Sequence, residues 1–185
     1  MTAPGVALYS VWMDITLIGD SKVREIRVIE SGNPFVDLAA RFSELTFDFE
    51  RKHVQKKSKS ILWGREEIGH MLLKAQENLP LGLKLLIKEC YRPLSIQREF
   101  FDEYSAHMGT EFNADPLQTE YATFTRASNI HSQAKENRAL LIDVMEKAGF
   151  INYPTEWWHW SYGDKYWAFM TGASHALYSS QEEIS

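Results

Sequence analysis

The sequence predicts an α+β domain in which helices pack on one side of an antiparallel sheet. Some stretches repeat apolar residues at helical spacing, and other, shorter stretches alternate apolar and polar residues as half-buried strands do. The length gives a further constraint, because 185 residues with 44% hydrophobic content can bury one sizeable core but leave little room for a second. We therefore expect residues 1–185 to form a single domain.

The first half of the chain is expected to begin with a strand and continue into a helix. After an irregular or β-like lead, residues 23–29 alternate enough to favour a strand. Residues 66–79 carry apolar side chains at helical spacing, and Pro80 with Gly82 marks the end of that helix. The apolar face of the helix would consist of Ile68, Met71, Leu72, Ala75 and Leu79.

A second strand is predicted over residues 83–87, where leucines and an isoleucine alternate with lysine. This half-buried strand would bring Tyr91 and Arg92 to its C-terminal end. Pro93 fits the first turn of a following helix. The apolar face of that helix would consist of Ile96, Phe100, Phe101 and Tyr104.

The second half is predicted to hold a long polar loop, a helix and an aromatic strand. The loop spans residues 108–129, and the helix spans residues 132–148 with Gly149 as its C-terminal stop. Its inward side chains would be Leu140, Leu141, Val144, Met145 and Ala148. Pro154 opens the aromatic strand.

Composition argues against several classes of partner. The net charge of −5 arises from interspersed acids and bases, and the basic segment over residues 51–59 fits a solvated loop, so nucleic acid is not expected as a ligand. The single cysteine, Cys90, excludes an internal disulfide and fits a buried, inert thiol. No signal-peptide pattern and no run of about 20 apolar residues is present, so we expect a cytoplasmic protein without membrane contact. The oligomeric state is left open by the sequence.

The most informative chemistry lies in an aromatic run near the C-terminus. Glu156 and His159 stand three residues apart among tryptophans and tyrosines. Aromatic walls exclude water and strengthen the electrostatic contacts that remain, which suits an acid/base or metal site. On an ideal strand the two side chains would point to opposite faces, so periodicity alone does not bring them together. A core strand with a merely hydrogen-bonded histidine is the alternative.

The Glu156-Trp157-Trp158-His159 run, the following Ser-Tyr-Gly-Asp-Lys-Tyr-Trp and the upstream Tyr91-Arg92-Pro93 together resemble the bacterial D-alanyl-D-alanine dipeptidases. These are zinc enzymes of the peptidoglycan-peptidase group. The likeness also takes in residues 28–38, 79–86, 108–115 and 137–178, in the same order. It implies a dipeptidase-like α+β domain that spans the whole chain.

The resemblance also implies roles for individual residues. In the family the strand bends so that the residue matching His159 binds zinc, and the residue matching Glu156 activates the metal-bound water. Arg92 would stabilise the transition state, and its place between a strand and a helix also suits a guanidinium that holds a carboxylate or oxyanion. A structural Arg92 paired with Asp102 or Glu103, and a structural Glu156 paired with a cation, are the alternatives.

Among the aromatic residues near this site, most are expected to belong to the core, with one or two touching substrate. The candidates for substrate binding are Tyr91, Trp157 and Trp158.

One departure from the family concerns the metal. Two of the three zinc ligands of the family come from a Ser-x-His-x-x-Gly-x-x-x-Asp motif, but here residues 100–107 run directly into Met108-Gly109-Thr110. We therefore expect no metal and no other cofactor. The remaining possibility is a substitute zinc site made by His107, Asp115 and His159, at a spacing unlike that of the family.

Three functions follow as hypotheses. The favoured one is a repurposed, metal-independent enzyme of specialised metabolism that uses Glu156, Arg92 and His159 in the inherited cleft on a small-molecule substrate. The second is a zinc-dependent D-alanyl-D-alanine dipeptidase with substitute ligands. The third is a noncatalytic binding protein on the same fold.

Overall fold

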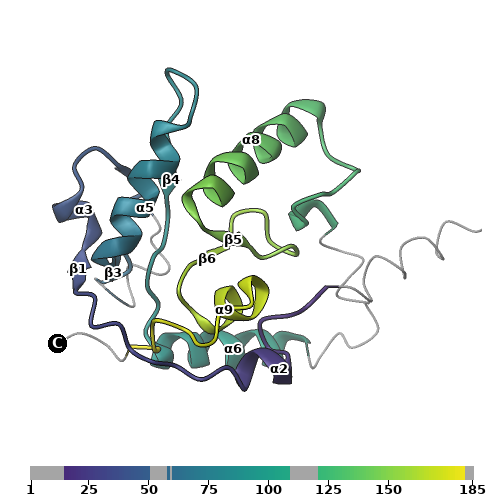
Figure 1. Cartoon of the computed structure of the whole chain (residues 1–185). Helices are drawn as coiled ribbons and strands as arrows, with labels where there is room; N and C mark the ends of the chain where they lie inside the picture. Colours follow the sequence, from purple (N-terminus) through teal and green to yellow (C-terminus); the bar gives the residue numbers. More distant parts are fainter. Residues whose placement is uncertain (1–14, 51–57, 59, 109–120, 182–185) are drawn as a thin grey trace, which may run out of the picture.

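The computed structural model describes residues 15–50, 58, 60–108 and 121–181, and the fold is reported for these residues (Figure 1). The helices are α2 (Ser21–Arg24), α3 (Leu38–Arg41), α5 (Glu66–Glu77), α6 (Leu94–Met108), α8 (Ser132–Ala148), α9 (Lys165–Thr171) and the 3-10 turn η1 (Tyr121–Thr123). The strands are β1 (Phe35–Asp37), β2 (Thr46–Phe47), β3 (Trp63–Arg65), β4 (Leu86–Ile87), β5 (Ile151–Asn152) and β6 (Trp160–Ser161).

The mixture of helices and short strands confirms the α+β class, whereas a single antiparallel sheet is not confirmed. The strands of the described residues form three two-stranded pairs: β1 with β3 and β5 with β6 are antiparallel, and β2 with β4 is parallel. Strands of two or three residues are at or below the short end of the range found in globular proteins. Two of them also pass directly into helices, because Asp37 caps α3 and Arg65 occupies the N-cap of α5.

The three longer helices lie where the sequence predicts them. Helix α8 has the predicted bounds, and Gly149 ends it in the left-handed conformation with φ of 101°. Helix α5 ends at Glu77, just before Pro80, and α6 begins directly after Pro93. Each helix therefore follows the local start and stop signals of its own sequence.

The predicted strand over residues 23–29 is wrong. The carboxylate of Asp20 accepts a hydrogen bond from the backbone N–H of Lys22 and begins α2, whose Val23 is buried. Only Val28 forms an isolated parallel bridge, with Ala176 near the other end of the chain. The helix N-cap formed by Asp20 was therefore a stronger local signal than the weak alternation of apolar and polar residues over 23–29.

The core lies between α5, α8 and the segments around β1 to β4. Helix α5 packs against α8, and α2 packs against α9 (Figure 1). Gly69 allows the close approach of the Phe42 ring to α5, because a Cβ atom at this position would lie 2.1 Å from that ring. The largest core cluster contains Leu38, Phe42, Leu45, Phe47, Ile61, Leu62, Leu72, Ala75, Leu85, Ile87, Val144, Met145, Ala148 and Phe150. Among the described helices, none combines the length and the apolar character needed to cross a membrane.

Candidate active site

Glu156 and His159 lie together at a double turn between β5 and β6, where the sequence predicts a continuous aromatic strand. The N–H of Glu156 donates to the carbonyl of Tyr153 at 2.9 Å, and the N–H of His159 donates to the carbonyl of Glu156 at 3.0 Å. A hydrogen bond of this kind closes a β-turn and brings its first and last residues close together. His159 Nδ1 lies 3.0 Å from Glu156 Oε2 as a result. Only Trp160 and Ser161 of the predicted aromatic strand are extended.

Both side chains of this pair remain reachable from solvent, since each is 40% exposed. When Nδ1–H donates a hydrogen bond to the Glu156 carboxylate, the imidazole is neutral and the lone pair of Nε2 remains available. Within the described part of the chain, Nε2 has no hydrogen-bond partner. The arrangement can therefore accept a proton at Nε2 or offer this nitrogen to a metal.

Asn152 holds the double turn from the β5 side. Its Nδ2 donates to the carbonyl of His159 at 3.1 Å and, more weakly, to the carbonyl of Glu156 at 3.4 Å. The hydroxyl of Thr125 donates to Asn152 Oδ1, which fixes the orientation of the amide. The backbone N–H of Thr125 also donates to the carbonyl of Pro154 at 3.0 Å.

The outer side of the turn is held by the segment around η1 and by α8. The Trp157 N–H donates to the Thr123 carbonyl at 2.9 Å, and the Thr123 hydroxyl donates to the Thr155 carbonyl at 2.9 Å. The Arg138 guanidinium lies 5.1 Å from the centre of the Trp157 ring. Trp158 precedes His159 in the chain, meets Trp157 edge to face and stays 50% exposed, so it forms an exposed aromatic surface on the same turn.

Behind the imidazole lies a layer of tyrosines. The Tyr153 ring contacts His159 with a centroid separation of 5.4 Å and meets buried Tyr166 at 5.4 Å on its other side. Burial raises the pKa of Tyr166 to about 12, with smaller contributions from Tyr153 and Asp164. Tyr166 therefore stays protonated at neutral pH and packs against the Tyr153 ring, which in turn contacts the imidazole.

Arg92 holds a carboxylate in the bidentate manner expected from its position, but the carboxylate belongs to Glu89. The Nε and Nη2 atoms lie 2.6 and 3.1 Å from the two Glu89 oxygens, and Nη1 donates to Gln97 at 2.8 Å. The guanidinium also stacks over Phe100. No hydrogen bond or ion pair in the described residues joins Arg92 to the Glu156–His159 pair.

Tyr91 is a buried core residue. Its ring packs edge to face against Phe35 at 5.1 Å, and its hydroxyl donates to the Gln181 carbonyl at 3.2 Å. Its predicted contact with substrate stays a prediction, as does the contact expected of Trp157.

The described residues do not assemble a zinc site. No three His, Cys, Asp or Glu side chains among them converge in a way that could hold a metal ion. Asp115 lies outside the described residues, and so does the side chain of His107, although its backbone belongs to α6. The substitute ligand set proposed from the sequence therefore remains a prediction.

Sequence reasoning missed a carboxylate that two tyrosines bind. The Tyr162 hydroxyl donates to Glu67 Oε1 at 3.2 Å, and the Tyr178 hydroxyl donates to Glu67 Oε2. Burial, together with this carboxylate, raises the pKa of both phenols. The guanidinium of Arg65 lies 5.2 Å from the Tyr178 ring centre and pairs with Glu30 at 2.7 Å. The two tyrosines are 95 and 111 residues from Glu67, so no local pattern could have revealed the cluster.

Comparison with known proteins places these residues in a family context. The sequence model of the D-ala-D-ala dipeptidase family matches residues 102–176, a range that contains Glu156 and His159 but not Arg92. A D-alanyl-D-alanine dipeptidase of Synechocystis sp. is 33% identical over 90 residues, which cover 49% of this chain and 34% of that protein. No solved structure matches the chain. Residues 102–176 of this chain are therefore similar in sequence to the D-ala-D-ala dipeptidase family, and the aligned part spans about a third of the length of the curated relative.

Proposed function

We propose that this protein is a repurposed D-Ala-D-Ala dipeptidase-like enzyme in which the Glu156–His159 pair performs metal-independent acid/base chemistry. The contact of 3.0 Å between His159 Nδ1 and Glu156 Oε2 carries the proposal. Both residues fall inside the range that matches the family. The substrate would be a small molecule of specialised metabolism.

The pair has the parts that a general base needs. Glu156 accepts a hydrogen bond from Nδ1–H, which fixes the tautomer, and its negative charge stabilises the imidazolium that forms when Nε2 takes a proton from water or a hydroxyl group. Hydrogen bonds from Asn152 to the carbonyls of both residues limit movement of the turn. The exposed Trp158 ring offers an apolar surface for a substrate beside the base.

Arg92 remains a candidate for stabilising developing negative charge. Its guanidinium already holds Glu89, so such a role would require a substrate anion to replace that carboxylate. The proposal for the Glu156–His159 pair does not depend on this exchange.

Metal independence is supported by the sequence, which lacks the family motif that supplies two of three zinc ligands. A second candidate function nevertheless has an observation in its favour. A carboxylate hydrogen-bonded to one imidazole nitrogen is also the arrangement that orients histidine ligands of zinc. With His107 and Asp115 as further ligands, bound zinc would supply a Lewis acid for dipeptide hydrolysis.

The test is hydrolysis of D-Ala-D-Ala and of a panel of small esters and amides, with and without chelator, by wild type and Glu156→Gln. We expect chelator to leave the activity unchanged and the variant to lose about 10²- to 10⁴-fold, with its melting temperature retained. Glu146→Gln is the matched control, because Glu146 is exposed on α8 and this substitution removes the same charge.

Each other outcome has a defined meaning. Full activity in Glu156→Gln would overturn the proposal. Zinc bound at one ion per chain, with activity lost in chelator and restored by zinc, would establish the second candidate. A wild-type protein that turns over none of the panel would favour a noncatalytic binding protein.

A further inference from the structure

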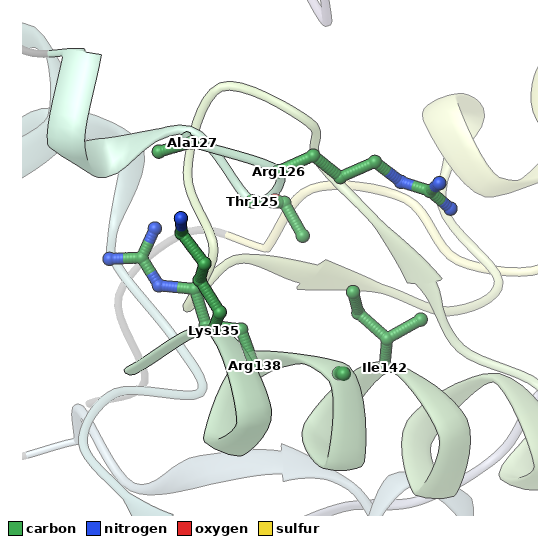
Figure 2. A pocket seen from close by; sticks show the side chains of 7 residues that line it. Thr125, Arg126, Ala127, Lys135, Arg138 and Ile142 are labelled. Carbon is green, nitrogen blue, oxygen red and sulfur yellow. The ribbon is translucent and has the colours of Figure 1, made fainter. Parts of the chain in front are cut away.

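A cavity of about 370 Å³ lies between residues 125–127 and helix α8 (Figure 2). The side chains that α8 contributes belong to Lys135, Arg138, Ala139 and Ile142, which follow the spacing of one helical face. The volume falls near the lower end of about 300 to 1,000 Å³ that is typical of small-molecule sites. The cavity is therefore large enough to hold a small ligand.

The charged residues that line this cavity are all basic. Arg126, Lys135 and Arg138 line it, and no acidic residue is among its lining residues. Lys135 and Arg138 are three positions apart on α8, which makes them neighbours on the helix surface, so their positive charges repel each other. In Figure 2 both side chains extend from α8 toward the loop, whereas the Arg126 guanidinium points away from them. An anion placed at the ends of Lys135 and Arg138 would relieve this repulsion.

Both cations have donors to spare. Among the described residues, no partner contacts the Lys135 ammonium group, and this residue is exposed. Arg138 uses Nη1 and Nη2 to bind the carbonyls of Phe124 and Ala122, at 2.6 and 2.8 Å. These neutral acceptors bring no negative charge to the guanidinium, and within the described residues its further N–H donors have no partner.

The remaining wall of the cavity is apolar. Ala127, Ala139 and Ile142 provide it, together with the methylene stems of the basic residues. We propose that this cavity binds a small carboxylate with a short apolar body. Lys135 and Arg138 bind the carboxylate, and Ile142 contacts the body.

The cavity shares two residues with the scaffold of the Glu156–His159 turn. Thr125 lines the cavity and also bonds Asn152 and Pro154, while Arg138 stacks on Trp157. A bound carboxylate would therefore contact the residues that position the turn. The proposed site does not require the turn to be catalytic, and its occupancy is measurable without any enzymatic assay.

The experiment is a titration of the full chain with butyrate, followed by amide and methyl NMR signals. Butyramide serves as the neutral isostere, and inorganic phosphate serves as an anion without an apolar body. We expect butyrate to shift the signals of residues 125–127 and the Ile142 methyl groups with a Kd of about 1 to 10 mM, as the size of the ligand suggests. Butyramide and phosphate should each bind at least about 10-fold more weakly.

Lys135→Gln should weaken butyrate binding about 10-fold, because it removes one charge-assisted contact. Lys147→Gln removes the same charge from an exposed position on α8 and should change the Kd by less than about twofold. If butyramide bound as tightly as butyrate, the proposed role of the carboxylate charge would be overturned. If phosphate bound as tightly as butyrate, the proposed contribution of the apolar body would be overturned. If both lysine variants lost butyrate affinity equally, the binding would be nonspecific electrostatic attraction, and the proposed site would be overturned.

Glu156→Gln separates this proposal from the enzymatic one. The variant should bind butyrate as wild type does, since Glu156 does not line the cavity. Absence of binding in the wild type would overturn the carboxylate site and leave the acid/base proposal unaffected.

Discussion

Replacing Asn152 with aspartate tests how the turn that carries Glu156 and His159 is held. The substitution keeps the shape of the side chain and lets Thr125 still donate to an oxygen, but it removes both N–H donors. It also places a carboxylate oxygen against two carbonyl oxygens. The variant therefore removes the support of the turn without creating a cavity.

The magnitude follows from the individual contacts. The bond to His159 at 3.1 Å counts as a full hydrogen bond worth about 1 kcal/mol, and the bond to Glu156 at 3.4 Å counts as about half of that. Both carbonyls keep a backbone partner, so neither is left unsatisfied. Repulsion and desolvation of the new carboxylate add about 1 kcal/mol. We expect a loss of about 2 to 3 kcal/mol in the free energy of unfolding at pH 7.

Urea denaturation monitored by tryptophan fluorescence measures this loss, with Asn129→Asp at an exposed loop position as the control. The folded state disfavours the new carboxylate, so its pKa should rise above the unfolded value of about 3.9. The deficit should therefore shrink as pH falls from 7 toward 3, relative to wild type. A loss below about 0.5 kcal/mol at pH 7, or a deficit that grows in acid, would refute the proposed role of the amide.

Three further predictions concern the frame around the site. Gly69→Ala should lower the free energy of unfolding by about 1 to 3 kcal/mol, because the new Cβ would meet the Phe42 ring and this clash outweighs the better helix propensity of alanine. Gly19→Ala serves as the control, since Gly19 lies in open space. Burial raises the pKa of Tyr162, Tyr166 and Tyr178, so these phenols ionise at lower pH in the unfolded chain than in the folded protein. The free energy of unfolding should therefore fall as pH rises above about 10. A denaturation midpoint that stays constant between about pH 8 and 11 would contradict this prediction. Burial also raises the pKa of the Cys90 thiol to about 12, so iodoacetamide at pH 8 should modify it rapidly only after denaturation, as mass spectrometry would show.

The three longer helices could be predicted from the sequence because their signals are local. Helix α8 combines an apolar face with a stop at Gly149, and all of this information lies within residues 132–149. The strands could not be predicted in the same way. Each has two or three residues and exists through its partner, as in the pairing of Thr46 with Leu86.

The candidate site was predictable only in part. The aromatic run brought Glu156 and His159 to notice, and the resemblance implied that they act together. Their contact depends on a turn within a segment that period-two reasoning treats as a strand. The partner of Arg92 is Glu89, three residues upstream, at a distance that sequence reasoning could have covered. Glu67 is different, because its tyrosine partners come from the far end of the chain.

The contacts between the two ends of the described chain bear on how the protein folds during synthesis. Residues 27–31 exchange backbone hydrogen bonds with Ala176 and Leu177, and Glu30 accepts two hydrogen bonds from Ser179. Helix α2 packs against α9 in the same region. While the chain emerges from the ribosome, this early segment has to wait for residues made more than a hundred positions later. Native assembly of this region therefore follows the synthesis of residues 176–179, and until then the early segment stays open to chaperones or proteases.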